Sequence, residues 1–455
     1  MYGRRFVKIT RLATCVTVLI LLAISCSEME TKWSRKFDVL GPGSYRINSL
    51  SSSKKEIYLT GTYIEDKQGS KCFTAKYAPD GSLNWYKIYE TPDTEQAAGV
   101  AMSVMRTQAE LLAARSDIYV LVEIRNTTGH EKVMLVKYDS LGNVQWQKKV
   151  TEHNGPITSM LLSDYSGNLY VAGQKTDVDN KPTLYIEKYT ELGETSWFTT
   201  YYNEQIVSEF LKFDITEPDY FVVAGLSKNT REFFYMKYDS TGQFQRLIRS
   251  ETKNRVRQLS DLKIGPEGNI FITATISNLE TGDDFLTVAY DKGDSLLWSN
   301  EYDGDAHGND ISRFISVDEL SNVYVTGKSE NAEGITIIVT MKYDLTGNHV
   351  WTQSLTQKDP VEPFFMEPRY LRLGERAYLQ HLYVVGTIEN NVLIALCNTN
   401  GFFTWHKQHS AAGKVTRPTA LSPPCLAMEC SADGRSDALL VKYGPSEILG
   451  LTRWD

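Results

Sequence analysis

The sequence predicts an all-β fold: a β-propeller, most simply of eight four-stranded blades, with seven blades as the alternative count. Three observations support it. A Tyr-x-x-x-Gly-x-x-x-Trp signature recurs along the chain, an apolar run of strand-forming residues precedes each copy, and the copies are about 50 residues apart. A propeller blade of four short strands and their turns has this length and content.

The signature is the strongest of the three observations. The copies that start at Tyr77, Tyr138 and Tyr189 each have Trp eight residues later, whereas the copy at Tyr238 has Arg246 there. The eight anchor positions are Tyr77, Tyr138, Tyr189, Tyr238, Tyr290, Tyr343, Cys397 and Tyr443. Their mean spacing, (443 − 77)/7, is about 52 residues, so eight units need about 418 of the 430 residues from Cys26 to Asp455.

Within each unit the residues predict strand, turn and strand. Residues 133–138 are rich in β-formers, Gly142 ends a four-residue turn, and alternation resumes at Val144. The upstream runs, such as 169–173, are almost continuously apolar, as a strand buried on both faces requires. A second turn precedes several of these runs, for example residues 164–168.

The two ends of the chain predict how the ring closes. Residues 33–37 resemble an outer strand without a preceding Lys-Tyr unit, and the last unit, at Tyr443, has Leu451 where Trp is expected. We therefore expect residues 33–37 to complete the last blade. The alternative is that residues 448–454 form its outer strand and leave the N-terminal segment as a tether.

The first 25 residues have the pattern of a signal peptide. Basic residues precede an apolar run, 12–24, which spans about 20 Å as a helix and is shorter than a bilayer core of about 30 Å. Ser25 and Cys26 resemble a bacterial lipobox, although Ala23 stands where that motif usually has Leu. We predict lipidation at Cys26, a tether over 26–32 and one propeller domain over 33–455. Ordinary secretion is the alternative.

Cys26 is followed by Ser27 and not by Asp, which under bacterial sorting logic favours the outer membrane. The expected location is therefore the outer membrane, facing the periplasm or the cell surface, with the lipid anchor as the sole membrane contact. The net charge of −8 and the pI near 5.6 argue against a nucleic-acid partner. Cys425 and Cys430 either pair in an oxidising envelope or remain free thiols.

The repeat resembles the bacterial β-propeller repeat family known as SBBP. The matching residues are 164–173 with 188–197, and 318–327 with 342–351. The resemblance covers nearly the whole mature chain and implies a propeller of an envelope or secreted protein. The family name implies seven blades, from which the count of eight departs.

The signature is also similar to the tryptophan-docking repeat of eight-bladed quinoproteins. Those enzymes hold pyrroloquinoline quinone and calcium beside a vicinal Cys-Cys pair, and this chain has no adjacent cysteines. A non-enzymatic comparison is the lipid-anchored propeller of the outer-membrane barrel assembly machinery. That comparison implies an interaction scaffold, but fold alone does not fix function.

No motif predicts a catalytic residue, a metal site or a cofactor. The seven His lack zinc-ligand spacing, and no nucleophile elbow or phosphate-binding loop is present. Residues 177–180 and 303–310 resemble calcium loops but lack the twelve-residue EF-hand pattern. We expect both segments to be solvated turns.

Residues that recur once per blade are expected to pack the blades together. These are the Trp and Tyr columns and the glycines Gly61, Gly173, Gly327 and Gly386; the Lys before each Tyr is expected to be exposed. Function is expected where blades differ. The candidates are 91–115, with a helix at 95–105 as an alternative, and the Pro-rich stretch 359–368.

The leading functional hypothesis is a non-catalytic, lipid-anchored binding or scaffold protein of the bacterial cell envelope. Its expected partners are envelope proteins or surface glycans. One alternative is an enzyme, such as a hydrolase, a lyase or a quinoprotein, with a cluster of carboxylate, His or Arg side chains at the channel mouth. The other alternative is a surface adhesin.

Overall fold

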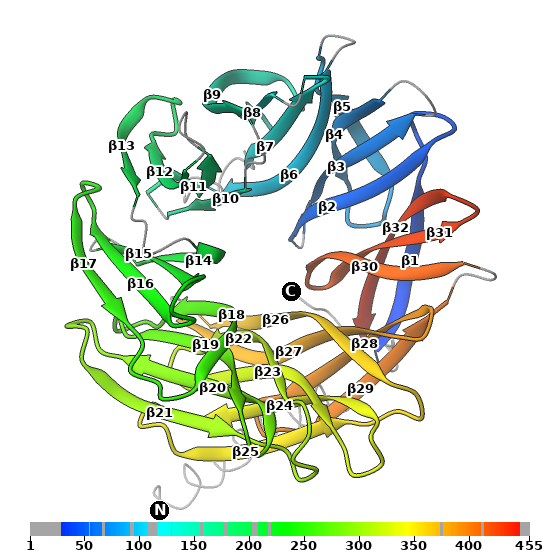
Figure 1. Cartoon of the computed structure of the whole chain (residues 1–455). Coiled ribbons are helices and arrows are strands. Elements are labelled where there is room, and N and C mark those ends of the chain that lie inside the picture. The colour runs from blue at the N-terminus through cyan, green and yellow to red at the C-terminus, as the bar shows by residue number, and fades with distance from the viewer. Residues whose placement is uncertain are drawn as a thin grey trace, which may run out of the picture.

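The structure is a computed structural model that places most of the chain from Met29 to Pro445 (Figure 1). It describes residues 29–53, 55–65, 69–91, 95–106, 116–128, 130–154, 158–164, 166–176, 181–202, 208–216, 220–373, 376–410 and 414–445. The predicted signal peptide, Cys26, and residues 177–180 and 448–454 lie outside these ranges.

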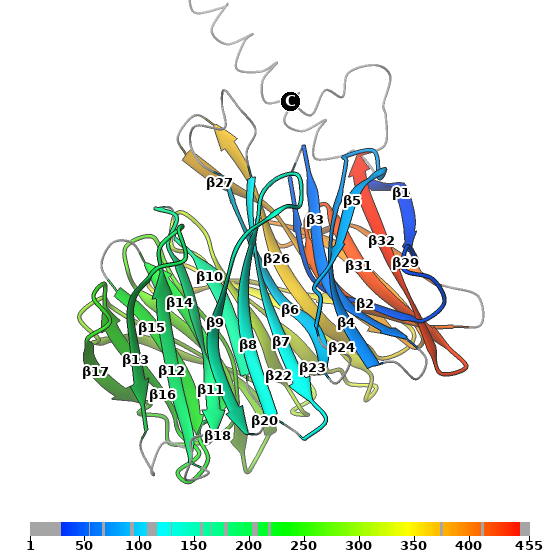
Figure 2. The same ribbon diagram turned by 90° about the horizontal axis from the view of Figure 1, so that it is seen from above.

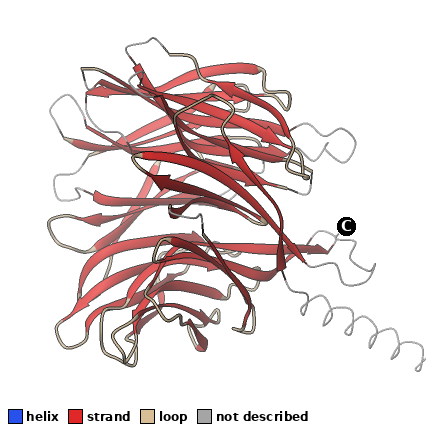
Figure 3. Ribbon diagram, turned by 90° about the vertical axis from the view of Figure 1, so that its right-hand side faces the viewer, coloured by secondary structure: helices blue, strands red, loops and turns tan. Residues whose placement is uncertain are grey.

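The described chain forms a ring of eight blades, each a four-stranded antiparallel sheet (Figure 1). The predicted fold class and the count of eight are confirmed. Every regular element within the described ranges is a strand (Figure 3). Over the same ranges, no helix has the length and apolar character needed to cross a membrane.

From the strand at the channel to the strand at the rim, blades 1 to 7 run in sequence order, and blade 8 differs only in that its rim strand is β1. Blades 1 and 2 are β2 (Ser44–Ser52), β3 (Ile57–Glu65), β4 (Gly69–Tyr77), β5 (Leu83–Ile88), and β6 (Glu95–Arg106), β7 (Ser116–Asn126), β8 (His130–Tyr138), β9 (Val144–Asn154). Blades 3 and 4 are β10 (Thr158–Ser163), β11 (Leu169–Thr176), β12 (Pro182–Tyr189), β13 (Thr195–Tyr201), and β14 (Ser208–Thr216), β15 (Tyr220–Ser227), β16 (Phe233–Asp239), β17 (Phe244–Arg249).

The second half of the ring repeats this order. Blades 5 and 6 are β18 (Arg255–Ile264), β19 (Ile270–Asn278), β20 (Gly282–Tyr290), β21 (Leu296–Tyr302), and β22 (Ile311–Val317), β23 (Val323–Glu330), β24 (Thr336–Tyr343), β25 (His349–Leu355). Blades 7 and 8 are β26 (Val361–Leu373), β27 (Arg376–Ile388), β28 (Asn391–Asn398), β29 (Phe403–His409), and β30 (Val415–Ser422), β31 (Cys425–Ala432), β32 (Arg435–Pro445), β1 (Met29–Phe37).

The two faces of the ring follow from this topology. The innermost strand and the third strand of each blade end on one face, here called the upper face, and the other two strands end on the lower face. Because β1 runs antiparallel to β32, with Met29 opposite Pro445, the described chain starts on the upper face. The β26–β27 hairpin projects from that face too (Figure 2).

The N-terminal strand closes the ring as predicted. β1 forms the outer strand of blade 8 by pairing with β32. The strand begins at Met29, so it includes the last four residues of the predicted tether, 29–32. Phe37 is fully buried and stacks on Phe73 of blade 1, with ring centroids 4.4 Å apart.

Two segments expected to be loops or a helix are inner strands. Residues 95–106 form β6 and not a helix, because the demand for a fourth strand in blade 2 overrides the helix propensity of its Ala, Gln and Met residues. Residues 361–368 lie in β26 and not in a projecting loop. Pro363 and Pro368 are tolerated there because this edge strand faces the channel, where no strand needs their missing N–H groups.

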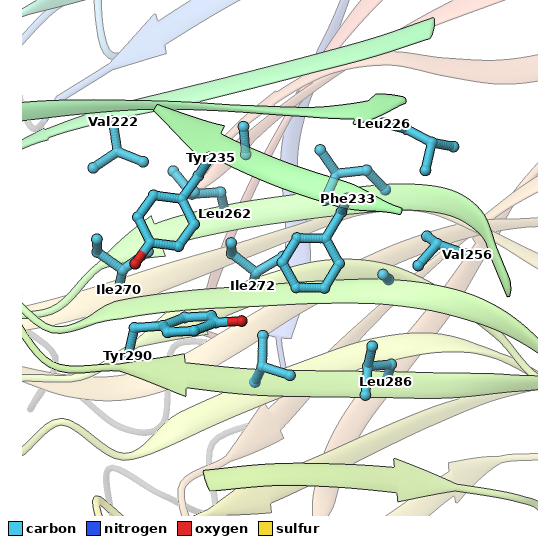
Figure 4. Close-up of a cluster of buried hydrophobic side chains, with 14 of the residues drawn as sticks. Val222, Leu226, Phe233, Tyr235, Val256, Leu262, Ile270, Ile272, Leu286 and Tyr290 are labelled. Atoms are coloured by element: carbon cyan, nitrogen blue, oxygen red, sulfur yellow. The ribbon is translucent and has the colours of Figure 1, made fainter. Parts of the chain in front are cut away.

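The core lies between adjacent blades and not at the ring axis. Between blades 4 and 5, Val222 and Tyr235 pack against Ile272 and Tyr290 (Figure 4). The glycines of the second strands allow the inner strands to approach closely: a Cβ on Gly61 would lie 2.0 Å from the Arg46 carbonyl oxygen. The interpretation of this glycine column as packing is confirmed at Gly61, Gly327 and Gly386.

The four cysteines of the described residues, Cys72, Cys397, Cys425 and Cys430, are free and buried. Cys425 and Cys430 lie on the same strand, β31, five residues apart. An extended strand separates such residues by about 16 Å, far beyond the 4.4–6.8 Å Cα spacing of a disulfide. The free-thiol alternative is therefore the correct one.

Candidate functional site

The recurring Trp residues join neighbouring blades. The Trp85 Nε1–H donates to the Ser140 carbonyl of the next blade at 3.1 Å. A Cβ on Gly142 would lie 2.9 Å from the Trp85 ring, so glycine leaves room for the indole. The same hydrogen bond recurs for Trp33, Trp146, Trp197, Trp298 and Trp351. These Trp residues are therefore occupied by packing, as predicted.

The seam between blades 4 and 5 replaces this aromatic contact with an ion pair. In blade 4, Arg246 stands where Trp is expected. In blade 5, Asp294, with φ of 73°, stands where other blades have their turn glycine. The Arg246 Nη1 lies 3.4 Å from the Asp294 carboxylate and donates to the Gly293 carbonyl at 3.3 Å. The degenerate repeat thus keeps the contact between blades by a paired substitution.

The prediction that the repeated Lys residues are exposed is wrong. Lys137 and Lys237 are 8% and 9% exposed. The Lys137 Nζ lies 5.3 Å from the centroid of the Tyr119 ring and donates to the Glu191 carbonyl of the next blade at 3.2 Å. These Lys residues belong to the contacts between blades because each Nζ donates to a backbone carbonyl of the next blade. The aromatic ring lies on the same blade as the Lys and stabilises the cation through its charge distribution.

The candidate site lies at the upper end of the central channel. Three innermost strands, β18, β22 and β26, surround a cavity of about 440 Å³, here called the channel pocket. Its charged groups are Asp261, Lys263 and Glu367, and its apolar walls include Phe314 and Phe365. Cavities of about 300–1,000 Å³ with a few polar groups are typical ligand sites.

Two carboxylates near the pocket hold inner strands together. Asp214 accepts the Ile264 N–H of blade 5 at 2.9 Å, and Asp261 accepts the Ile315 N–H of blade 6 at 3.2 Å. Each also accepts the N–H of the residue that follows it. Because their oxygens are engaged by backbone donors, these two side chains position the pocket wall.

Lys263 and Glu367 remain as the free charged groups of the pocket. Within the described part of the chain, neither side chain forms a hydrogen bond or a close ion pair. Both are accessible within the channel, where the surrounding protein reduces their hydration. Burial opposes the charge on Lys263, but the carboxylates of Asp261, Asp214 and Glu367 raise its pKa. Burial and the charge of Asp261 raise the pKa of Glu367 to about 7, despite the opposing effect of Lys263.

The raised pKa of Glu367 predicts a pH dependence of stability. The folded protein holds the carboxyl proton of Glu367 more tightly than the unfolded chain does. The stability that this proton contributes is therefore present at low pH and is lost as the pH rises from about 4.5 to about 7. We expect Glu367→Gln to unfold at a temperature that declines less than that of the wild type between pH 5 and pH 8. Parallel melting curves for the two proteins would contradict the raised pKa.

The β26–β27 hairpin extends one side of the pocket outwards from the upper face (Figure 2). Tyr370 is 41% exposed and its hydroxyl donates to the Val317 carbonyl at 3.2 Å, and Tyr378 is 36% exposed. Exposed tyrosines beside a pocket are typical of protein interfaces because they bury a large area with little loss of side-chain freedom.

The structure brings part of one predicted functional segment to this site and leaves others apart. Phe365 and Glu367 come from the Pro-rich stretch 359–368 and line the pocket. Of 91–115, residues 95–106 form β6 of blade 2, while 92–94 and 107–115 lie outside the described residues, as does Cys26. Asp261 and Lys263 were missed, although a charged pair inside an apolar strand run was a usable signal.

Comparison with known proteins yields similarity of fold alone. No protein-family model and no curated protein sequence matches the chain. Similar solved structures include puromycin hydrolase (9% identity, 89% of this chain, 60% of that chain, TM-score 0.47) and the WD40 domain of SCAP from fission yeast (10%, 92%, 98%, 0.40). A third comes from a study of two prolyl endopeptidases (11%, 89%, 55%, 0.48). At these identities and scores, none bears on the activity of this chain.

Proposed function

We propose that this chain is a non-catalytic, lipid-anchored binding protein of the bacterial cell envelope, related to the SBBP repeat proteins. Its partner is another envelope protein, which docks on the β26–β27 hairpin and inserts a Lys or Arg side chain into the channel pocket. The observation that carries the proposal is the hairpin, since its exposed Tyr370 lines the pocket and both Tyr370 and the exposed Tyr378 lie outside the repeat.

The charges of the pocket support a cationic group as the inserted side chain. Asp261 and Glu367 line the pocket together with one ammonium group, Lys263, and the nearby Asp214 adds a third carboxyl group. Aromatic residues in the wall add a favourable surface for a Lys or Arg stem. A surface glycan would use the same aromatic residues, and it is an outcome that the experiment below separates.

The topology supports a pocket that faces the membrane. β1 starts at Met29 on the upper face, three residues after Cys26. Three residues span at most about 11 Å. A lipid on Cys26 would therefore hold the upper face, with its pocket and hairpin, close to the membrane surface, where segments of membrane proteins are within reach.

The test is affinity capture of the full-length chain from its own membranes. We expect the wild type to recover a specific envelope protein, and Tyr370→Ala combined with Tyr378→Ala to reduce recovery at least tenfold. Tyr86→Ala is the matched control, because Tyr86 is also 41% exposed but lies on β5, away from the pocket. We expect Cys26→Ser to release the protein from the membrane fraction.

Each alternative has its own outcome in this experiment. Equal recovery by the double variant and Tyr86→Ala would exclude the hairpin as the docking surface. Recovery of glycan and no protein would favour the glycan partner. A bare monomer that turns over a glycan would contradict a non-catalytic role.

One observation favours the enzymatic alternative. Glu367, with a pKa of about 7, is suited to donate or accept a proton near neutral pH. It lies near Lys263 and opposite the hydrogen-bonded Asp261. Among the described residues of the pocket, however, no nucleophile is hydrogen-bonded to a base, so the geometry supports binding better than catalysis.

A further inference from the structure

A second polar cluster lies on the lower face, at the seam between blades 5 and 6. Asp284 comes from the start of β20, and Asp303 and Asp310 come from the connection between β21 and β22. One carboxylate oxygen from each lies within 4.8 Å of the others. The cluster is thus built from positions up to 26 residues apart (310 − 284) that only the fold brings together.

The cluster is buried, and each carboxylate has an unpaired oxygen. Asp284 and Asp310 are 1% and 0% exposed. The Oδ1 atoms of Asp284, Asp303 and Asp310 are all inaccessible to solvent and accept no hydrogen bond from the described residues. Burying a carboxylate oxygen without a partner costs about 1–3 kcal/mol or more, so three in one place indicate a missing partner.

The remaining oxygens fix the geometry of the cluster. Oδ2 of Asp310 accepts the Gly304 N–H at 2.8 Å, and Oδ2 of Asp284 accepts the Thr281 hydroxyl at 2.7 Å. A Cβ on Gly304 would lie 2.6 Å from the Ser329 hydroxyl and 3.0 Å from Oδ1 of Asp310, so glycine leaves room for both groups. Donors on Oδ2 therefore hold the Asp284 and Asp310 carboxylates in place.

No basic side chain neutralises the cluster within the described ranges. The ion pair that reaches it joins Asp303 to the exposed His307, which is charged only when protonated. The adjacent Asp283 differs, because it pairs with Arg257 at 2.6 Å and accepts the Ser277 hydroxyl at 3.1 Å. Burial raises the pKa of Asp310 to about 6, with a smaller contribution from the charges of Asp303 and Asp284 and against the opposing effect of the Ser329 hydroxyl and the Gly304 N–H.

We propose that Asp284, Asp303 and Asp310 bind a divalent cation, with Ca²⁺ as the best fit, and that the cation fastens blade 5 to blade 6. Carboxylate oxygens are hard ligands that suit Ca²⁺ and Mg²⁺. Ca²⁺ at 2.3–2.6 Å from each ligand accommodates oxygens up to about 5 Å apart, whereas Mg²⁺ at about 2.1 Å needs them within about 4.2 Å. The three oxygens lie within 4.8 Å of one another, which is inside the limit for Ca²⁺.

This site departs from the expectation that residues 303–310 are a solvated turn. The pattern within 303–310 contains only two of the three ligands, because the third, Asp284, lies on a strand of the preceding hairpin. The cation would hold the crossover from the rim of blade 5 to the channel strand of blade 6. That crossover is also tied by the backbone bond from the Asp310 N–H to the Asp283 carbonyl at 2.5 Å.

The test compares thermal unfolding of the purified full-length protein in excess EDTA and in millimolar CaCl₂. We expect Ca²⁺ to raise the melting temperature by about 3 °C or more, and calorimetric titration with CaCl₂ to show one site with weaker binding of MgCl₂. Asp310→Asn and Asp284→Asn should each weaken Ca²⁺ binding at least tenfold. Asp305→Asn is the matched control, since Asp305 is exposed in the same loop and outside the cluster.

A second readout separates a cation site from a purely structural cluster. In EDTA, Asp310→Asn should melt at the same temperature as the wild type or higher, because it removes one of three mutually repelling charges. In Ca²⁺, Asp310→Asn should melt at a lower temperature than the wild type. A wild-type melting temperature unchanged by Ca²⁺, or an equal loss of Ca²⁺ binding in Asp305→Asn, would overturn the proposal.

Discussion

Replacing Trp197 by Ala should destabilise the protein by about 2–4 kcal/mol. This is somewhat less than a fully buried aromatic side chain would lose, because the indole is half-buried. The ring stacks on Phe221 with centroids 5.6 Å apart, covers Gly242, and donates its N–H to the Ser240 carbonyl at 3.0 Å. The variant would therefore lose apolar contact and a hydrogen bond across the seam between blades 3 and 4. Denaturant titration followed by circular dichroism measures the change.

The next residue on the same strand provides the control. Phe198 is 71% exposed on β13, and Phe198→Ala should change stability by no more than about 0.5 kcal/mol. Gly242→Ala tests the other side of the seam, because φ is +81° and the added Cβ would lie 2.4 Å from the Trp197 ring. Equal effects of Trp197→Ala and Phe198→Ala would mean that the repeated indole does not join the blades.

Phe37→Ala should weaken the closure of the ring and destabilise the fold by about 3–5 kcal/mol. Phe37 is fully buried between Tyr45 and Phe73 of blade 1, on the strand that completes blade 8. The loss of stability should be greatest where β1 and β32 close the ring. Hydrogen exchange measured by mass spectrometry should therefore accelerate first in β1 and β32.

The neighbouring Lys36 is the control for this second experiment. Its side chain is 49% exposed and pairs with Asp437 at 3.0 Å, and such surface pairs contribute about 0–1 kcal/mol. If residues 448–454 formed the outer strand of blade 8 in solution, Phe37→Ala would have an effect as small as Lys36→Ala. Protection of β32 would then be unchanged.

Most of the fold could be predicted from the sequence because each blade repeats the same packing problem. Tyr138, Gly142 and Trp146 recur at fixed spacing, and each occupies the same place relative to the next blade. From the sequence alone, Arg246 is a departure from the repeat, and nothing in its own unit indicates that Asp294 is its partner. The two form one exchanged contact across a seam, which no single unit of the repeat reveals.

The sites were much harder to predict because they depend on residues from different blades. Asp261 and Glu367 line one pocket from blades 5 and 7, more than 100 residues apart, and Asp284 meets Asp310 across a hairpin. Local propensity was misleading too, since residues 95–106 favour a helix but supply an inner strand. The sequence pointed to 359–368 as distinctive, and that stretch does supply Glu367 to the pocket.

The closure of the ring sets the order in which this chain reaches its final form. β1 is the first described strand to be synthesised, yet it pairs with β32, and Met29 lies opposite Pro445, 416 residues later (445 − 29). The last blade therefore cannot be completed until almost the whole chain has been made. Contacts of such long sequence separation form slowly, so the ring stays open until its last strand has been made.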